Sequence, residues 1–278
     1  MAVELNGDGS EDSRANDLRV LVWNLHGMYA GSRTRRRIRL AVQRIVDARP
    51  DVVLLQEIWP TQLVPIVSRF FGTSYRPVEG PTSRINVQLG GLMAFVSRHA
   101  RGLAFVESEY LPFESSAPWW RVREGDGLGR KGIQRLELDT PAGRFAVLNT
   151  HVQSPYPGRD YREVRRRQLR QLADVGNGLV ARMPVLAAGD LNTEADEEIF
   201  AEALGGWNDL TLAHRTSLGG SSHIEDDGSA GGWIDHVLAR DHAALAVRAR
   251  HLELIENHRV DDPFSDHHGL CIDLSLDG

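Results

Sequence analysis

Nine apolar runs of strand length constrain the fold of this chain more than any other feature of its sequence. Each run is bounded by turn residues, as β-strands commonly are. The runs cover residues 18–25, 52–57, 92–97, 132–138, 145–152, 185–188, 234–239, 244–254 and 269–276. A chain with this pattern is expected to build most of its core from β-sheet.

Helical patterns lie between some of these runs. Residues 34–48 place apolar side chains such as Ile38 and Val42 on one face, which predicts an amphipathic helix. Residues 161–183 are rich in arginine and glutamine, and residues 194–204 begin with the acidic side chains that a helix N-terminus prefers. We therefore predict three helices in addition to the strands.

The order of these patterns predicts the domain organisation. Strands and helices alternate in the early part of the chain, consecutive strands are more frequent later, and no proline- or serine-rich linker divides the sequence. We predict one mixed α/β domain over residues 18–278, with sheets covered by helices. The first 17 residues are acidic and polar, without the basic start and apolar centre of a secretory signal. We interpret them as a disordered tail.

Composition limits the partners and the compartment. The net charge of −6 gives no overall attraction to nucleic acid or to an anionic membrane, so any basic patch must be local. The single cysteine, Cys271, excludes a disulfide within the chain and favours a reducing compartment. No apolar run approaches 18 residues, so no membrane-spanning helix is predicted. We expect a cytoplasmic monomer whose contact with membranes is at most peripheral.

Polar side chains follow the apolar runs at the points where the predicted strands end or begin. They are Asn24, Glu57, Asn149, His151, Asp190, Asn192, Asp235, Asp266 and His267. Ligand and catalytic groups commonly gather where strands end and loops begin. These side chains therefore form a candidate site, although they come from separate parts of the chain.

Each of these residues also has an ordinary structural explanation. Asn24 can make a turn, and Asp190 and Asn192 can bond their own backbone in a tight loop. His151 can be a buried histidine with a satisfied hydrogen bond. Chance matches to short motifs are frequent. The complete set is harder to explain in this way, because oxygen ligands and two histidines all flank buried strands.

The residue types point to metal-assisted hydrolysis. Carboxylates and amides are hard oxygen donors that suit Mg²⁺ or Mn²⁺, and the set contains Glu57, Asp190, Asp266, Asn24 and Asn192. A zinc site would need cysteines or clustered histidines at ligand spacing, which the sequence does not present. A divalent cation beside two histidines can hydrolyse a phosphate ester, because the metal neutralises phosphoryl charge and the histidines exchange protons.

Eight segments together resemble the endonuclease/exonuclease/phosphatase superfamily, and within it the neutral sphingomyelinases. In chain order they read "WNLHG", "LLQEIW", "GGLMAFVSR", "GDGLGRKGI", "NTHVQ", "GDLN", "WIDHVLAR" and "SDHHGL". They appear in the family's order within residues 18 to 276, nearly the whole chain. The resemblance implies a four-layer α/β sandwich of the deoxyribonuclease I type, in which helices flank two packed mixed sheets. It places the site at one end of those sheets.

The same resemblance implies a role for each site residue. Glu57 is expected to be the principal Mg²⁺ ligand, with Asn24 and Asp266 beside it. Asp190 and Asn192 are expected to orient the attacking water and the phosphate.

The two histidines are expected to handle the protons. By the resemblance, His267 is the general base and His151 is the acid or the oxyanion stabiliser. A buried carboxylate beside a histidine can fix its tautomer, and we assign this role to Asp235 as the partner of His267.

The only lysine among 32 basic residues is Lys131, in a glycine-rich loop five residues after Asp126. One explanation is compositional bias toward arginine, with a single surface lysine left by chance. The resemblance offers another, because neutral sphingomyelinases carry an Asp and a Lys at this spacing. The lysine reaches the lipid phosphate and the aspartate positions it. A compact ammonium on a flexible stem suits that task better than a rigid guanidinium.

Other features leave the substrate open. The segment "ENHRVDDPF" is short and polar where secreted bacterial sphingomyelinases have an aromatic hairpin, and Trp119 and Trp120 could contact lipid or pack beneath a loop. We predict a Mg²⁺-dependent phosphodiesterase of the sphingomyelinase type. The main alternative is a nuclease, since arginine clusters at residues 33–39 and 162–170 could follow a phosphate backbone. A non-catalytic binding protein is the third, and it is disfavoured because no expected catalytic position is substituted.

Overall fold

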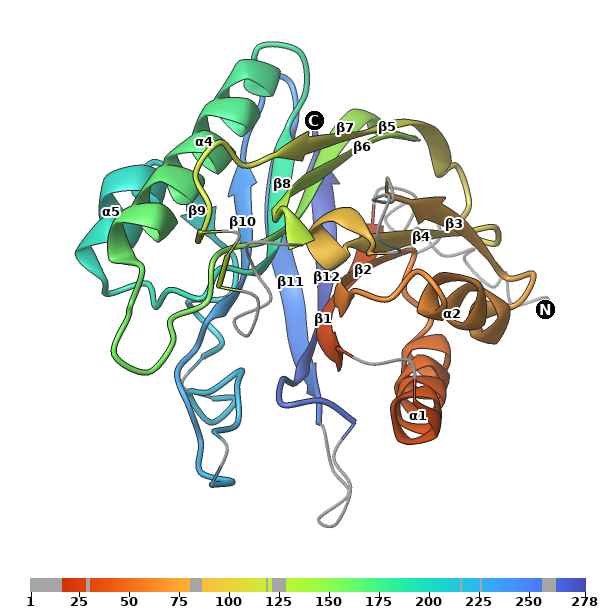
Figure 1. Ribbon diagram of the computed structural model, residues 1–278. Coiled ribbons are helices and arrows are strands. Elements are labelled where there is room, and N and C mark those ends of the chain that lie inside the picture. Colours follow the sequence, from red (N-terminus) through yellow and green to blue (C-terminus); the bar gives the residue numbers. More distant parts are fainter. Residues whose placement is uncertain are drawn as a thin grey trace, which may run out of the picture.

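Two six-stranded mixed sheets pack face to face in the computed structural model, with helices on the outside of both (Figure 1). The structure describes residues 17–28, 31–80, 87–118, 120–121, 129–215, 217–225, 227–256 and 264–278. Asp126, Trp119 and most of the "ENHRVDDPF" segment lie outside these ranges, as do the first 16 residues.

The first sheet has the strand order β11-β12-β1-β2-β4-β3. Its strands are β1 (Asp17–Gly27), β2 (Val52–Ile58), β3 (Tyr75–Glu79), β4 (Met93–Ser97), β11 (Ala246–Ile255) and β12 (Gly269–Asp277). β1 and β2 are parallel, and the other neighbours in this sheet are antiparallel. The C-terminal ends of β1 and β2 therefore lie beside the N-terminal end of β12.

The second sheet has the strand order β5-β6-β7-β8-β10-β9. Its strands are β5 (Ala104–Pro112), β6 (Gly132–Thr140), β7 (Gly143–His151), β8 (Val185–Asp190), β9 (Asn208–Asp209) and β10 (Asp235–Arg240). Here β7 and β8 form the parallel pair, and β10 runs antiparallel to β8. The C-terminal ends of β7 and β8 consequently meet the N-terminal end of β10.

The helices complete four layers. α1 (Ser32–Ala48) and α2 (Leu63–Phe71) cover the first sheet, while α4 (Arg162–Val180) and α5 (Glu198–Leu204) cover the second (Figure 1). A short 3₁₀ turn, η2 (Leu89–Gly91), precedes β4. One buried apolar cluster lies between the sheets and one lies under each helical layer. The expected four-layer α/β sandwich is confirmed.

Side-chain alternation along the strands determines what reaches the space between the sheets. In β1, Leu21 and Trp23 join the cluster under α1 and α2, whereas Val20 and Val22 join the cluster between the sheets. Alternate side chains of a strand point to the same face. Asn24 therefore continues the row of Val20 and Val22, and it lies at the end of that row where the apolar core stops.

All nine predicted strands and all three predicted helices are present, within a few residues of their expected bounds. Asp17, which we had assigned to the tail, begins β1. Sequence reasoning missed β3, β5, β9 and α2. The three missed strands are all edge strands, which pair on one side only and so need no continuous apolar run. In the described part of the chain, no helix is long and apolar enough to cross a membrane.

Candidate active site

Strand ends from both sheets bring the predicted site residues to one edge of the sandwich. His151 at the end of β7 is in register with Asp190 at the end of β8, and Asp190 is in register with Asp235 at the start of β10. Across the gap, β1 and β2 end near Asn24 and Glu57. Because each sheet has one parallel pair flanked by an antiparallel strand, three strand ends of each sheet, six in all, converge on this edge.

Asn24 links the two sheets at the centre of the site. Its amide nitrogen donates to Glu57 Oε1 at 3.2 Å and to Asp190 Oδ2 at 3.0 Å, while its Oδ1 accepts from the backbone N–H of His26 at 3.0 Å. Asn24 is 1% exposed, so these contacts are made away from water. In this arrangement the amide presents its NH₂ group to the carboxylates, and its oxygen is engaged by the His26 backbone.

Glu57 reaches the site because its backbone leaves the regular strand conformation. Its φ of 62° lies in the left-handed region, which a non-glycine residue occupies at a cost of about 1–2 kcal/mol. Burial raises the pKa of the carboxyl, and the negative charge of Asp266 adds to this effect. Its Oε2 is buried and accepts no hydrogen bond from the described residues. A strained backbone therefore holds, at the edge of the sandwich, a carboxylate oxygen that accepts no hydrogen bond from the described residues.

Asp266 faces Glu57 across the imidazole of His26. His26 Nδ1 lies 2.9 Å from Asp266 Oδ2 and 3.9 Å from Glu57 Oε2. The hydrogen bond to Asp266 raises the pKa of His26, against an opposing effect of burial. Burial raises the pKa of Asp266, but its contacts with His26 and the charge of His267 outweigh this and hold that pKa well below its usual range. The carboxylates of Glu57 and Asp266 thus both approach His26 Nδ1, where they stabilise a positive charge.

His267 and Asp235 form a buried pair. His267 Nδ1 lies 2.8 Å from Asp235 Oδ2, which also accepts a 2.8 Å hydrogen bond from Ser222 Oγ. Burial lowers the pKa of His267, but the carboxylates of Asp235 and Asp190 outweigh it and hold that pKa well above its ordinary value. With Nδ1 engaged by Asp235, Nε2 is the ring atom that faces the site, 3.6 Å from Asp190 Oδ2.

His151 has the opposite electrostatic environment. Burial, reinforced by the positive charge of Lys131, holds the pKa of His151 well below its ordinary value. Its Nε2 lies 2.9 Å from Lys131 Nζ, 3.5 Å from Asp190 Oδ2 and 3.8 Å from Glu57 Oε1. Asp190 Oδ2 is therefore close to the Nε2 atoms of both histidines, one with a raised pKa and the other with a lowered pKa.

Lys131 is buried at 2% exposure, so it is not a surface lysine left by chance. Besides His151, its Nζ donates to the carbonyl of Val152 at 2.8 Å and to Ser154 Oγ at 3.2 Å. The ammonium thus enters the site from the start of β6. Asp126, its expected partner, lies outside the described residues.

Asn192 is positioned by a tight turn and by two neighbouring side chains. It has a φ of 47°, its N–H donates to Asp190 Oδ1 at 2.9 Å, and its Nδ2 donates to the Val152 carbonyl at 3.0 Å. Arg165 of α4 donates to the Asn192 carbonyl at 2.5 Å, and His236 Nε2 lies 2.9 Å from the next carbonyl, that of Thr193. The tight loop expected here is present, and its asparagine side chain lies beside the residues that follow β7.

The arginines of α4 do not form an open basic surface. Every arginine of the predicted cluster on this helix pairs with a glutamate: Arg162 with Glu198, Arg165 with Glu197, Arg166 and Arg167 with Glu163, and Arg170 with Glu202. On α1, Arg37 donates to the backbone carbonyls of Phe264 and His26.

Trp120 is 64% exposed, so it does not pack in the core.

His26 was missed by sequence reasoning, and its left-handed φ of 46° lies in an irregular stretch of β1 between Asn24 and Gly27. It lines a cavity of about 300 Å³ next to the site, together with Arg37, Ile224 and Asp266. A larger cavity of about 810 Å³, bordered by Asp17 at the start of β1, lies at the opposite end of the strands from these residues.

Known proteins resemble this chain in sequence and in fold. Nocturnin from Drosophila melanogaster is 25% identical over 208 residues, 68% of this chain and 31% of that protein, so the chain spans about a third of its length. The solved structure of D. rerio TDP2 complexed with single-strand DNA product has a TM-score of 0.74 at 18% identity, covering 93% of this chain and 99% of that one. Sphingomyelinase C from Streptomyces griseocarneus has a TM-score of 0.65 at 19% identity, covering 92% and 99%.

Structural matches at such identities show the fold alone. The family itself is shown by a sequence model described as the Endonuclease/Exonuclease/phosphatase family, which matches residues 21–267. This region contains every predicted site residue. The chain therefore belongs to the endonuclease/exonuclease/phosphatase family of hydrolytic enzymes.

Proposed function

We propose that this protein is a Mg²⁺-dependent phosphodiesterase of the sphingomyelinase type, which cleaves a phospholipid head group by attack of water. One observation carries the proposal. Asp190 Oδ2 lies 3.5 Å from Nε2 of His151 and 3.6 Å from Nε2 of His267, and Asn24 Nδ2 links it to Oε1 of Glu57. Carboxylate oxygens that can bind a hard cation therefore lie next to two histidines, one with a lowered pKa and one with a raised pKa.

The donor set fits a hard divalent cation. Glu57 and Asp266 would hold Mg²⁺, or Mn²⁺ in its place, because a carboxylate oxygen of each lies within 3.9 Å of the same atom, His26 Nδ1. Asn24, the third predicted ligand, would join them by turning its amide oxygen away from the His26 N–H. When bound, the ion supplies charge neutralisation on the phosphoryl group and activation of water, and its positive charge favours a neutral imidazole at His267.

The two histidines divide the proton transfers in this proposal. His267 accepts a proton at Nε2 from the attacking water, and Asp235 keeps the ring oriented by holding Nδ1. His151, at the end of β7 in the second sheet, stabilises or protonates the leaving-group oxygen of the phosphodiester. Asp190 and Asn192 orient the water and the phosphate between them.

Lys131 is the proposed phosphate contact. Its ammonium lies 2.9 Å from His151 Nε2, so it can pair with a phosphoryl oxygen held beside that ring. This pairing, with Asp126 as the positioning partner, is what favours a phospholipid head group over other phosphodiesters. The exposed Trp120, next in sequence to a second tryptophan, suits a peripheral contact with a lipid surface. We propose that the protein acts as a monomer in the cytoplasm.

Nucleic acid is the alternative substrate. The solved TDP2 structure complexed with single-strand DNA product favours it through the shared fold. The ion pairs that occupy the arginines of α4 count against it, because paired guanidinium groups attract a phosphate backbone less strongly.

A substrate panel tests the proposal. Sphingomyelin, lysophospholipids, plasmid DNA, an abasic duplex and inositol phosphates would each be incubated with the protein in Mg²⁺, and again in EDTA. We expect hydrolysis of a choline-containing phospholipid that stops in EDTA and returns with Mg²⁺ or Mn²⁺. Preferential cleavage of a nucleic acid would establish the alternative, and full turnover in EDTA would exclude the mechanism.

A further inference from the structure

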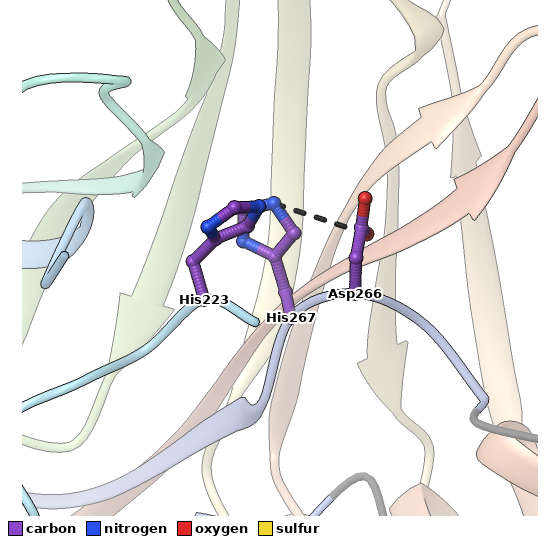
Figure 2. A group of neighbouring side chains, drawn as sticks. All are labelled: His223, Asp266 and His267. Carbon is purple, nitrogen blue, oxygen red and sulfur yellow. Dashed lines mark ion pairs between the residues drawn. The ribbon is translucent and has the colours of Figure 1, made fainter. Parts of the chain in front are cut away.

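We propose that His223, Asp266 and His267 form a second cation site, which selects a transition-metal ion such as Zn²⁺ and blocks hydrolysis when it is filled. One ligand atom from each of these side chains lies within 4.8 Å of the others. Figure 2 shows the two imidazole rings next to each other, with the Asp266 carboxylate across from them. The mechanism proposed above makes no use of His223.

Backbone pairing fixes the relative positions of the three residues. His223 forms an antiparallel bridge with His267, the N–H of Ile224 donates to the Asp266 carbonyl at 2.7 Å, and the N–H of His268 donates to the Ser222 carbonyl at 2.9 Å. The ring centroids of His223 and His267 are consequently 4.9 Å apart. The two histidines are 44 positions apart in sequence, and so they do not show the close spacing of a zinc motif.

Two of the three ligands are oriented by a further contact. His267 is held at Nδ1 by Asp235 at 2.8 Å, which leaves Nε2 for an ion. Histidines that bind metals commonly have this arrangement, with a carboxylate on the other ring nitrogen. Asp266 is held at Oδ2 by His26 at 2.9 Å, and its Oδ1 lies 4.0 Å from His267 Nε2. The side chain of His223 is 23% exposed, so an ion can reach the cluster from solvent.

The spacing suits a small ion. In a tetrahedral site with bonds of about 2.1 Å, ligand atoms are about 3.4 Å apart. The cluster would therefore contract by at most about 1.4 Å from its 4.8 Å limit, a change within the reach of side-chain rotation. Asp190 Oδ2 lies 3.6 Å from His267 Nε2 and places a further oxygen atom beside that nitrogen.

The donor set distinguishes this site from the proposed Mg²⁺ site. Two imidazoles and one carboxylate suit Zn²⁺, Co²⁺ or Ni²⁺, whereas Mg²⁺ prefers oxygen ligands alone. The two sites share Asp266. An ion bound at His267 Nε2 also occupies the lone pair with which that atom would accept a proton. The inhibitory consequence rests on the proposed function, but the existence of the site does not.

Cobalt gives a test of the site that does not depend on activity. Tag-free, metal-free protein would be titrated with Co²⁺, whose visible absorption reports nitrogen ligation at low coordination number, and then with Zn²⁺ as a competitor. We expect one Co²⁺ per chain, displaced by Zn²⁺, and an affinity at least about 10-fold weaker in His223→Ala and His223→Gln. His251→Ala is the matched control, because His251 is an exposed histidine on β11. Equal Co²⁺ affinity in parent and His223 variants, at unchanged circular dichroism, would overturn the site.

Activity gives the second test. With Mg²⁺ saturating and the best substrate of the panel, Zn²⁺ should inhibit the parent and His251→Ala at the same concentration. Inhibition of His223→Ala should need at least about 10-fold more Zn²⁺. Co²⁺ binding without Zn²⁺ inhibition would overturn the inhibitory role. Absence of any hydrolysis in Mg²⁺ would instead overturn the proposed function, and the cobalt titration would still decide the site.

Discussion

Substitution of Lys131 gives the sharpest test of how this protein would bind a phosphate. Lys131→Met removes the ammonium and keeps most of the unbranched stem, so the 2% exposed position stays filled. Three contacts are lost: with His151 Nε2, with the Val152 carbonyl and with Ser154 Oγ. The variant therefore separates the charge of this side chain from its volume.

The structure sets the expected magnitudes. The Val152 carbonyl still accepts from Asn192 Nδ2 at 3.0 Å, and Ser154 is partly exposed to water, so neither is left buried and unpaired. The free energy of unfolding should fall by only about 1 kcal/mol, the net value of one hydrogen bond. The loss of a phosphate contact should instead lower kcat/KM by roughly 10- to 100-fold, which is about 1.4 to 2.8 kcal/mol of transition-state binding.

Steady-state kinetics in Mg²⁺ and urea unfolding would be measured on the same preparations. Arg130→Met is the matched control, since it removes a neighbouring exposed positive charge. Lys131→Arg should not rescue the activity, because a larger planar group in a buried position costs about 1–3 kcal/mol in packing. Asp126→Ala should lower kcat/KM nearly as much as Lys131→Met if it positions the lysine. A parent-like kcat/KM in Lys131→Met would refute the phosphate contact and remove the main reason for preferring a phospholipid.

Three further substitutions test the rest of the site and its support. Glu57→Gln should abolish most Mg²⁺-dependent activity. The melting temperature should stay unchanged or rise, because burial disfavours the charged carboxylate. Retained activity would exclude Glu57 as the main metal ligand. Asp235→Asn should lower kcat by about 10²- to 10⁴-fold in steady-state assays by freeing the ring of His267, and a parent-like kcat would contradict the pairing. Asp209 is stabilised in its charged form: burial raises its pKa, but His236, Thr211 and Arg215 outweigh this and lower it to about 2. The contribution of Asp209 to the free energy of unfolding is therefore complete above its unfolded pKa near 4 and is lost as pH falls toward 2. In urea unfolding, the difference in free energy of unfolding between the parent and Asp209→Asn should be about 2 kcal/mol smaller at the acid end than at pH 5. A difference that stays constant with pH would exclude this linkage.

The sequence by itself determined the central strands and the residues at their ends. Interior strands are covered on both faces, so they appear as apolar runs, and the polar residue that ends such a run marks where the core stops. Val20, Val22 and Asn24 show this directly, because the alternation that buries the two valines between the sheets also delivers the asparagine to the site. The order of the motifs then indicated the family and its four layers.

Only the tertiary structure decided how the side chains meet. The burial of Lys131 and its contact with His151 depend on β6 and β7 lying side by side, and the sequence around the lysine reads as an exposed glycine-rich loop. The position of His223 beside His267 depends on pairing between segments 44 residues apart. The turn of Glu57 into the site depends on a left-handed backbone conformation that its own sequence does not favour.

The physical reason is the range of the interactions. Burial pattern and strand propensity act over a few neighbouring residues and are therefore visible in the sequence. Edge strands such as β3 and β5, the ion pairs that occupy the α4 arginines, and the charge environments of the two histidines are all set by partners that are distant along the chain. The sequence determined which chemical groups this protein brings to one edge of its sheets, and the packing of those sheets determined which group touches which.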